Sequence, residues 1–265
     1  MVAHETTNSS MNSRTPRMAG HDRVSEWTLT ADHGRPAVPL RRFQPPSEYR
    51  KILIVGAGGF GREVLQWAHD AWPEWDDRIA GFLSDDLARL AGFRGSHRIL
   101  GTVRDHSPED GTAYLLAIGV AYARRSVAEN LQRRGASFIT LVHPSAVVGE
   151  TAVIGTGSIV CPNAVISDSS ALGECVLVNY HASLGHDATA GAYAVLSPYA
   201  TLGGAASIGN DVFLGLHASV GPGVSVGERS KISANSCALS SVPPDSLVYG
   251  VPGRISPRVD PDLGR

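Results

Sequence analysis

The sequence predicts an α/β domain of alternating strands and helices, followed by an all-β solenoid. Two observations predict this order. A compact apolar run at residues 51–55 leads directly into a glycine-rich turn and a helical segment. From Val148 to Ala238 every sixth residue is apolar, and no insertion breaks the phase. A strict short period is the mark of a solenoid, because each repeat buries its apolar residue only by stacking on its neighbours.

The six-residue period also constrains the shape of each repeat. It fits neither the spacing of a helix nor that of a plain alternating strand. The residue after each apolar position is most often glycine, and the residue four positions after it is small or β-branched. This pattern fits a short strand followed by a corner, in which the aliphatic side chain points inward and the small residue allows a tight turn.

Composition limits the function classes. The 265 residues include 23 Lys and Arg against 25 Asp and Glu, so no basic field argues for nucleic acid or an anionic membrane. No apolar run reaches the roughly 20 residues of a membrane span, and the N-terminus lacks the apolar core of a signal peptide. Cys161, Cys175 and Cys237 lack metal-type spacing, which predicts reduced thiols in a cytoplasmic protein.

Strand and helix patterns alternate over residues 51–141. After the glycine turn and its helical segment, the predicted elements are a strand at 79–86, a short strand at 99–101, a buried strand at 113–119, a helix at 124–134 and a short strand at 138–141. We therefore divide the chain into a flexible extension at 1–50, a Rossmann-like domain at 51–142, a solenoid at 143–255 and a tail at 256–265. Within the extension, Trp27 and Leu29 could dock on the rest of the chain.

The glycine turn has the spacing of a nucleotide-binding fingerprint. Gly56, Gly58 and Gly61 occupy the glycine positions of G-x-G-x-x-G. Glycines let the backbone approach a phosphate, and the free N–H groups that open the helix near Arg62 favour an anion. The turn could also be only a tight packing corner, and both interpretations are open. The domain is too short for the double fold of a dehydrogenase, which favours nucleotide binding without hydride chemistry.

Acidic residues end the second predicted strand, where a Rossmann-like unit holds the ribose of its nucleotide. Asp85 or Asp86 could accept hydrogen bonds from a ribose, and a helix N-cap is an equally open interpretation. The predicted substrate-binding residues come from the glycine turn, this acid and the end of the buried strand. They are Gly56, Gly58, Gly59, Phe60, Gly61, Asp85 and Gly119.

The motifs along residues 51–255 are, in order, GAGGFGREV, GFLSD, LLAIG, TLVHPSAVVG and the hexapeptides. Their order resembles that of sugar acetyltransferases, namely the bacillosamine- and perosamine-type nucleotide-sugar N-acetyltransferases and the sialic acid O-acetyltransferases. The resemblance implies a left-handed parallel β-helix, acetyl-CoA as co-substrate, no metal, and a homotrimer with its sites between adjacent subunits. Many members have His where this chain has Phe60, so the acceptor could differ; uridine diphosphate is the first nucleotide that the resemblance implies.

A His–Asp pair is the candidate catalytic centre. On the residues alone, the adjacent His186 and Asp187 could be a general base with an orienting carboxylate, or an inert solvent-facing pair. The resemblance favours the first interpretation, since the matching family positions are a catalytic His, an acid that is usually Glu, and a preceding Asn. Here these are His186, Asp187 and Asn179. An imidazole pKa near neutrality suits proton removal from an acceptor amine or hydroxyl.

The same resemblance implies a coenzyme A groove. Gly204, one coil beyond His186, would supply an oxyanion N–H and contact the pantetheine arm. Leu216 and Ala234 would line the groove, and Arg254 would either meet the coenzyme phosphates or be a solvated cap residue. No cysteine adjoins His186, which predicts direct transfer without an acyl-enzyme.

Alternative functions follow from the same residues. The first prediction is acetylation of an amino group on a nucleotide-linked sugar. O-acetylation of a sugar hydroxyl, as on sialic acid, would use the same base, and a non-catalytic scaffold is the non-enzymatic alternative. A zinc hydrolyase of the γ-carbonic anhydrase type is disfavoured. His181 and His186 have the required spacing, but Ser145 stands where the third ligand should be, and His217 lies on the other side.

Overall fold

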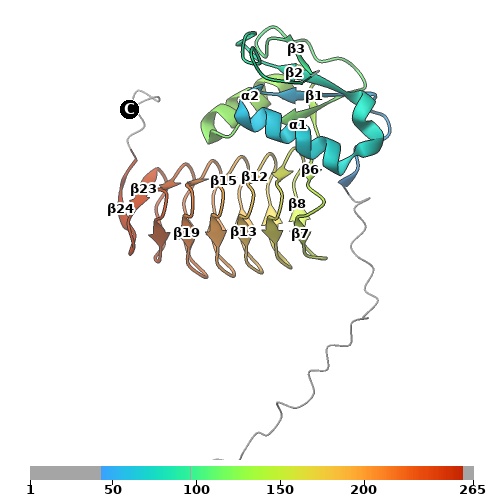
Figure 1. Cartoon of the computed structure of the whole chain (residues 1–265). Helices are drawn as coiled ribbons and strands as arrows, with labels where there is room; N and C mark the ends of the chain where they lie inside the picture. The colour runs from blue at the N-terminus through green and yellow to red at the C-terminus, as the bar shows by residue number, and fades with distance from the viewer. Residues whose placement is uncertain (1–42, 96, 259–265) are drawn as a thin grey trace, which may run out of the picture. The chain divides into compact units, whose positions relative to one another are not determined.

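The first part of the described structure is a parallel sheet flanked by helices. A computed structural model describes residues 43–95 and 97–258. The sheet contains β1 (Lys51–Val55), β2 (Ile79–Leu83), β3 (Arg98–Gly101), β4 (Thr112–Leu116) and β5 (Ser137–Phe138) in the order β3-β2-β1-β4-β5 (Figure 1). The helices are α1 (Gly59–Ala71), α2 (Ala121–Arg133) and the 3₁₀ helix η2 (Pro73–Arg78). This is the predicted Rossmann-like arrangement, in which the strand order reverses between β1 and β4.

The two long helices cover opposite faces of this sheet. Strand β4 is buried along its whole length, as expected of a parallel strand with helices on both sides. Val64 of α1 packs in one apolar cluster with Ile52 and Ile54, whereas Leu131 of α2 packs in another cluster with residues of opposite parity on β1. Alternate residues of the same strand therefore face different helices.

A parallel β-helix follows, which confirms the solenoid prediction. Its faces are sheets of short strands, and strands from β6 to β22 pair in register with the strand one coil, or 18 residues, further along, whereas Lys231 of β21 pairs with Leu247 of β23. Face 1 contains β6 (Leu141–Val142), β9 (Ile159–Val160), β12 (Leu177–Val178), β15 (Val195–Leu196), β18 (Phe213–Leu214), β21 (Lys231–Ile232), β23 (Ser246–Tyr249) and the antiparallel β24 (Arg254–Pro257). Face 2 contains β7 (Val147–Val148), β10 (Val165–Ile166), β13 (Ser183–Leu184), β16 (Thr201–Leu202), β19 (Ser219–Val220) and β22 (Cys237–Ala238). Face 3 contains β8 (Val153–Ile154), β11 (Ala171–Leu172), β14 (Thr189–Ala190), β17 (Ser207–Ile208) and β20 (Ser225–Val226).

Corner 1 is the turn from face 1 to face 2, as between β12 and β13. Corner 2 is the turn from face 2 to face 3, as between β13 and β14, and corner 3 is the turn back to face 1, as between β14 and β15. From Asn163 to Asn235, each corner contains a residue in the left-handed region, as at His181, Asp187 and Tyr193 with φ of 58°, 60° and 60°. The glycines have a different role from the one predicted. A Cβ on Gly185 would lie 2.7 Å from the N atom of Gly204, so this glycine allows two coils to approach rather than the chain to turn.

The junction between the two folds differs from the prediction at one strand. The single strand expected at 138–141 is two strands in the structure: β5 pairs with β4 in the first sheet, whereas β6 pairs with β9 in the β-helix. The division occurs because Leu141 N donates to Ser158 O, one coil ahead, and so starts the first turn of the solenoid. Helix α1 also begins at Gly59 rather than near Arg62.

Part of the predicted extension packs against the first domain. Trp72 Nε1 donates a hydrogen bond to Phe43 O at 3.0 Å, and Arg50 N donates one to Gly111 O at 2.8 Å. Trp27 and Leu29, with the rest of residues 1–42 and the tail residues 259–265, lie outside the described residues. The domain boundaries themselves stay predictions.

Face 1 is covered by the α/β domain. Its outward-pointing residues Ile159, Leu177 and Val195 are at most 2 % exposed and belong to the same apolar cluster as Trp67 and Ala68 of α1. The outward surface of face 1 is therefore part of the hydrophobic core of the α/β domain.

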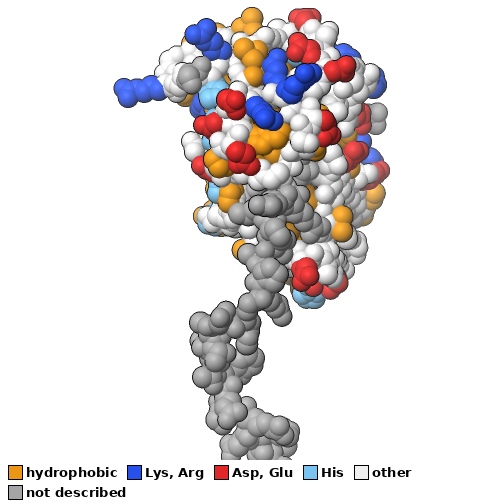
Figure 2. Space-filling view, turned by 90° about the vertical axis from the view of Figure 1, so that its right-hand side faces the viewer, with side chains coloured by type: hydrophobic (Ala, Val, Ile, Leu, Met, Phe, Trp, Pro, Cys, Tyr) orange, Lys and Arg blue, Asp and Glu red, His pale blue; other side chains and the backbone are white. Residues whose placement is uncertain are grey.

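Basic and acidic side chains are intermixed on the side of the molecule shown in Figure 2, so no large patch of one charge lies on this side. Within the described residues, no helix has the length and apolar character needed to cross a lipid bilayer.

Candidate functional site

The glycine turn after β1 contains glycines of two kinds. Gly56 has a φ of 110°, and a Cβ there would lie 2.6 Å from Ala117 O at the end of β4. A Cβ on Gly61 would lie 2.0 Å from Gly56 O. These two glycines are required by the fold, because the start of α1 and the end of β4 approach the turn closely. For them the packing-corner interpretation is sufficient.

The other glycines of the predicted site face open space. A Cβ on Gly58 or Gly59 would have no atom nearer than 3.9 Å, and one on Gly119 would have none within 4 Å. The nearest atoms to the first two belong to the guanidinium groups of Arg89 and Arg62. Packing does not require these glycines, and they leave room for a ligand beside the N–H groups of the first turn of α1 and two basic side chains.

The acids after β2 are partly engaged with the chain itself. Asp85 Oδ1 accepts a hydrogen bond from Arg104 N at 3.0 Å, and Asp86 Oδ1 accepts one from Ala88 N at 3.1 Å. Asp86 thus caps the following turn, which was the alternative interpretation of this pair. Both residues are exposed at the carboxyl edge of the sheet, where a doubly wound fold binds its ligand.

The side chain of Phe60 packs against other residues of the protein. It is half-buried, packs edge-on against Trp67 with the ring centroids 5.9 Å apart, and belongs to the cluster that joins α1 to face 1. Tyr180, at corner 1 of the β-helix, packs against the same cluster. Phe60, which follows the glycine turn, and Tyr180 of corner 1 therefore contact one shared apolar cluster.

Corner 2 carries the predicted catalytic pair. His186 Nδ1 and Asp187 Oδ2 are 2.7 Å apart, and their side chains are 74 % and 60 % exposed. Asp187 has the left-handed φ of 60°. Its backbone N donates a hydrogen bond to Asp168 O one coil earlier, and His186 O accepts one from Ala205 N one coil later, so backbone hydrogen bonds hold this corner to both neighbouring coils. In the tautomer in which Nδ1–H donates to Asp187, the lone pair of the neutral ring is on Nε2.

Gly204 lies directly against that ring. A Cβ on Gly204 would lie 2.6 Å from His186 Nε2 and 2.8 Å from its Cε1. The backbone N–H groups of the two neighbouring residues make hydrogen bonds between coils: Gly203 N donates to Val220 O and Ala205 N donates to His186 O. The structure thus brings together His186, Asp187 and Gly204, as the sequence predicts.

The remaining predicted residues do not join them within one chain. Asn179, Leu216 and Ala234 lie at corner 1, which face 2 separates from corner 2. Asn179 Oδ1 accepts a hydrogen bond from Tyr180 N at 2.8 Å, and Leu216 is 50 % exposed. In one copy, these side chains and the imidazole of His186 lie on different edges of the solenoid.

Corner 1 also carries a stack of rings that the sequence analysis did not identify. The Tyr199 ring is sandwiched between His181 and His217, with ring centroids 4.8 and 4.7 Å apart and interplanar angles of 10° and 7°. The three residues are 18 positions apart, so a search for aromatic residues at the coil period would have found them. In residues 43–95 and 97–258, no three His, Cys, Asp or Glu side chains are grouped to hold a metal ion.

Arg254 lies at the end of the solenoid, in the cap strand β24. It lines a cavity of about 340 Å³ together with Tyr249, Gly250, Val251 and Pro252. The side chain is exposed, and both interpretations of Arg254, a contact to the coenzyme phosphates and a solvated cap residue, stay predictions.

The α/β domain, the hexapeptide β-helix and the exposed His–Asp corner define a class of protein, the hexapeptide acyltransferases with an added N-terminal α/β domain. Comparisons with known proteins agree with this class. Residues 51–131 match the PglD N-terminal domain, and residues 205–237 match the hexapeptide repeat of succinyl-transferase.

Two solved structures are similar over nearly their whole length. The acetyltransferase domain of PglB from Neisseria gonorrhoeae, in complex with acetyl coenzyme A, is 30% identical, with 78% of this chain and 98% of that chain covered and a TM-score of 0.68. PerB from Caulobacter crescentus, in complex with CoA and GDP-perosamine, is 27% identical, with coverage of 78% and 97% and a TM-score of 0.68. The chain belongs to the acetyltransferase family of these proteins.

A curated relative matches over a shorter segment. UDP-N-acetylbacillosamine N-acetyltransferase of Bacillus subtilis is 32% identical over 115 residues, which are 42% of this chain and 51% of the relative. The match thus spans about half the length of that enzyme.

Proposed function

We propose that the protein transfers the acetyl group of acetyl-CoA to the amino group of a nucleotide-linked amino sugar. The observation that carries this proposal is the corner at which Asp187 orients His186 and the ring of His186 lies against Gly204. Relatives that bind acetyl-CoA, CoA and GDP-perosamine support the two substrates. The open glycines Gly58 and Gly59 support a diphosphate beside the N-terminus of α1.

In the proposed reaction, the acceptor amine attacks the carbonyl carbon of the acetyl thioester. Nε2 of His186 accepts the proton that the amine loses as the new C–N bond forms, while Asp187 stabilises the imidazolium. The N–H of Gly204 donates to the carbonyl oxygen as it becomes an oxyanion. When the intermediate collapses, the C–S bond breaks and the imidazolium returns its proton to the coenzyme A thiolate. No acyl-enzyme is needed.

The separation of corner 1 from corner 2 argues for a site between copies of the chain. Leu216, Ala234 and Asn179 can meet His186 only if corner 1 of one copy faces corner 2 of another. A ring of three copies closes such a head-to-tail contact, so we propose a homotrimer with three equivalent sites. The glycine turn shares an apolar core with corner 1, so the nucleotide domain and corner 1 of one copy serve the His186 of its neighbour.

Thiol release from acetyl-CoA with a panel of UDP- and GDP-linked amino sugars tests the proposal. We expect acetyl transfer to at least one of them, and a loss of at least roughly 100-fold in kcat for His186→Ala. Asp187→Asn should lower kcat less, by roughly 10-fold, because it removes only the orienting charge. Asp168→Asn, one coil earlier at the same corner, is the matched control and should retain wild-type turnover.

Several outcomes would contradict the proposal. Turnover of His186→Ala close to that of the wild type would remove His186 from the role of base. Transfer only to hydroxyl-bearing sugars, such as sialic acid, would replace N-acetylation by O-acetylation with the same base. No thiol release with any sugar would leave a non-catalytic solenoid.

A further inference from the structure

Arg124, in the first turn of α2, is buried with no carboxylate hydrogen-bonded to it. Its side chain has 0% exposure, and its guanidinium group donates to three backbone carbonyls. Nη1 donates to Leu116 O at 2.6 Å and to Ile118 O at 2.9 Å, whereas Nε donates to Cys175 O at 2.6 Å. Burial lowers the pKa of this guanidinium to about 10, which still leaves it charged at neutral pH.

The three carbonyls belong to the two parts of the proposed site. Leu116 ends β4, and Ile118 precedes Gly119 at the open edge of the sheet beside the glycine turn. Cys175 lies at corner 3, at the start of the coil that continues through Asn179 to His186. One side chain thus joins the edge of the sheet beside the glycine turn to the coil that carries Asn179 at corner 1.

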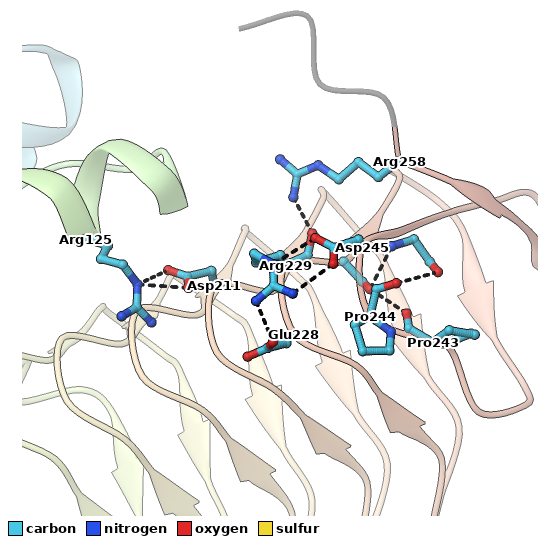
Figure 3. A network of polar contacts seen from close by, with 10 residues as sticks. Arg125, Asp211, Glu228, Arg229, Pro243, Pro244, Asp245 and Arg258 are labelled. Atoms are coloured by element: carbon cyan, nitrogen blue, oxygen red, sulfur yellow. Dashed lines mark hydrogen bonds and ion pairs between the residues drawn. The ribbon is translucent and has the colours of Figure 1, made fainter. Parts of the chain in front are cut away.

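Arg125, the next residue of α2, makes a second link to corner 3. Its Nε donates to both carboxylate oxygens of Asp211 at 2.8 and 2.9 Å, as Figure 3 shows. Its guanidinium carbon lies 4.4 Å from the ring centroid of Tyr193, one coil before Asp211 at the same corner. The hydrogen bond to Asp211 raises the pKa of Arg125, and Asp211 is only 15 % exposed.

The apolar contact between α1 and face 1 already holds the domain and the solenoid together. Apolar burial is non-directional, so that contact does not fix the register of one part on the other to a fraction of an ångström. Guanidinium hydrogen bonds to carbonyls and carboxylates have a fixed geometry and do set such a register. Both helices share apolar clusters with the solenoid, but the guanidinium hydrogen bonds to corner 3 come from α2.

We propose that Arg124 and Arg125 are positioning residues for acetyl transfer, which align the α/β domain, through Cys175 O and Asp211, with the coils that carry Asn179 and Leu216 at corner 1 of the same copy. This inference rests on the proposed function. Neither arginine touches a substrate; each acts by holding the nucleotide edge at a fixed distance from the solenoid, so that the sugar amine reaches the thioester in an attacking geometry.

Asp211→Asn is the decisive variant. Asn adopts the left-handed φ of 57° found at Asp211 without strain, so the substitution removes the charge and leaves the corner intact. The chain supplies a matched control in Asp245→Asn. Asp245 has a φ of 54° and pairs with Arg229 through two hydrogen bonds of 2.8 Å, but this pair lies at the end of the solenoid and does not involve α2 (Figure 3).

The measurement is steady-state acetyl transfer by the full chain, together with calorimetric binding of the nucleoside diphosphate and of acetyl-CoA. For Asp211→Asn we expect kcat to fall roughly 10-fold relative to Asp245→Asn, because small misplacements of a reacting group are costly. Both dissociation constants should stay within about twofold of wild type, since each substrate still meets its own intact subsite. Arg124→Lys should give the same split between kcat and binding. A lysine keeps the charge but cannot reproduce the three-carbonyl fork.

Two results would overturn the inference. One is a kcat for Asp211→Asn equal to that of Asp245→Asn at a temperature where both are folded, which would make the pair a stability contact only. The other is a loss confined to nucleotide affinity. If Arg124→Lys does not fold, Asp211→Asn still decides the question. Absence of any transfer by the wild type contradicts the proposed function instead, and the two failures are therefore distinct.

Discussion

The faces of the β-helix have the same interior and different exteriors. The inward residues of all faces belong to one continuous core. On face 1, the outward residues Leu141, Ile159, Leu177 and Val195 are large, apolar and buried, and the last three belong to the cluster shared with α1. Their counterparts include Val147 on face 2, which is 61% exposed, and Thr189 on face 3, which is also exposed. The six-residue repeat therefore determines the residues that point inward. The residues that point outward differ between the faces and determine what each face contacts.

This difference explains how a uniform solenoid carries a localised function. Burial of a large aliphatic side chain is worth about 1.5–3 kcal/mol, so the outward residues of face 1 suffice to hold a second domain. Faces 2 and 3 carry mostly small or hydroxyl-bearing outward residues, and between them lies the corner with His186. The covered face holds the α/β domain, which we propose binds the acceptor, and an uncovered corner carries the proposed base.

The largest expected effect comes from a charge placed on the covered face. Leu177→Glu buries a carboxylate between α1 and face 1, and we expect a loss of about 3–5 kcal/mol in the free energy of unfolding. Thr189→Glu makes the same change at an outward position of face 3 and should stay within about 0.5 kcal/mol of wild type. Urea unfolding measures both. Equal losses at the two positions would show that the faces do not differ as described.

The glycine turn offers a second comparison, between crowded and open glycines. Gly61→Ala places a Cβ against Gly56 O and should destabilise the fold by about 1–3 kcal/mol. Gly58→Ala meets no such contact and should leave the melting temperature unchanged, while it weakens nucleoside diphosphate binding by roughly 10-fold, or about 1.4 kcal/mol. Thermal melting and calorimetry on the same samples separate the two effects. Unchanged affinity in Gly58→Ala would leave the turn with a packing role alone.

The interior of the molecule was predictable, because one residue in six must be apolar for the coils to stack. The strand at 51–55, the helices after it and the doubly wound order follow from local patterns of the same kind. The covered face was harder to predict, since Ile159, Leu177 and Val195 recur every 18 residues among shorter repeats. The split at 138–141 depends on a contact with Ser158 one coil ahead, which no local pattern contains.

The candidate site was predictable in part, for a similar reason. His186, Asp187 and Gly204 lie on one corner, and the coil period brings them together. Leu216 and Ala234 lie on another corner of the same copy, so their place in a groove beside His186 stays a prediction that requires a neighbouring copy. The alignment contacts of Arg124 and Arg125 join segments 51 and 86 residues apart in sequence, so no spacing rule indicates them.

The smallest effect concerns the thiols, which report directly on the covered region. Cys161 and Cys175 are buried, and burial raises the pKa of both, to about 11 for Cys175. At pH 8 these thiols stay protonated and inaccessible, so iodoacetamide should label only Cys237 on face 2 in the native protein. Mass spectrometry counts the labels. Rapid labelling of Cys175 without denaturant would mean that the α/β domain does not stay on corner 3.

The central claim is that one copy supplies His186 and a neighbouring copy supplies corner 1. Co-expression of His186→Ala with Leu216→Glu, each inactive as a homotrimer, tests it most directly. If the two residues come from different copies, random mixed trimers contain intact sites at about a quarter of their interfaces, and acetyl transfer recovers to that fraction. Activity that stays at the level of the two parent variants would place both residues in one copy and contradict the account.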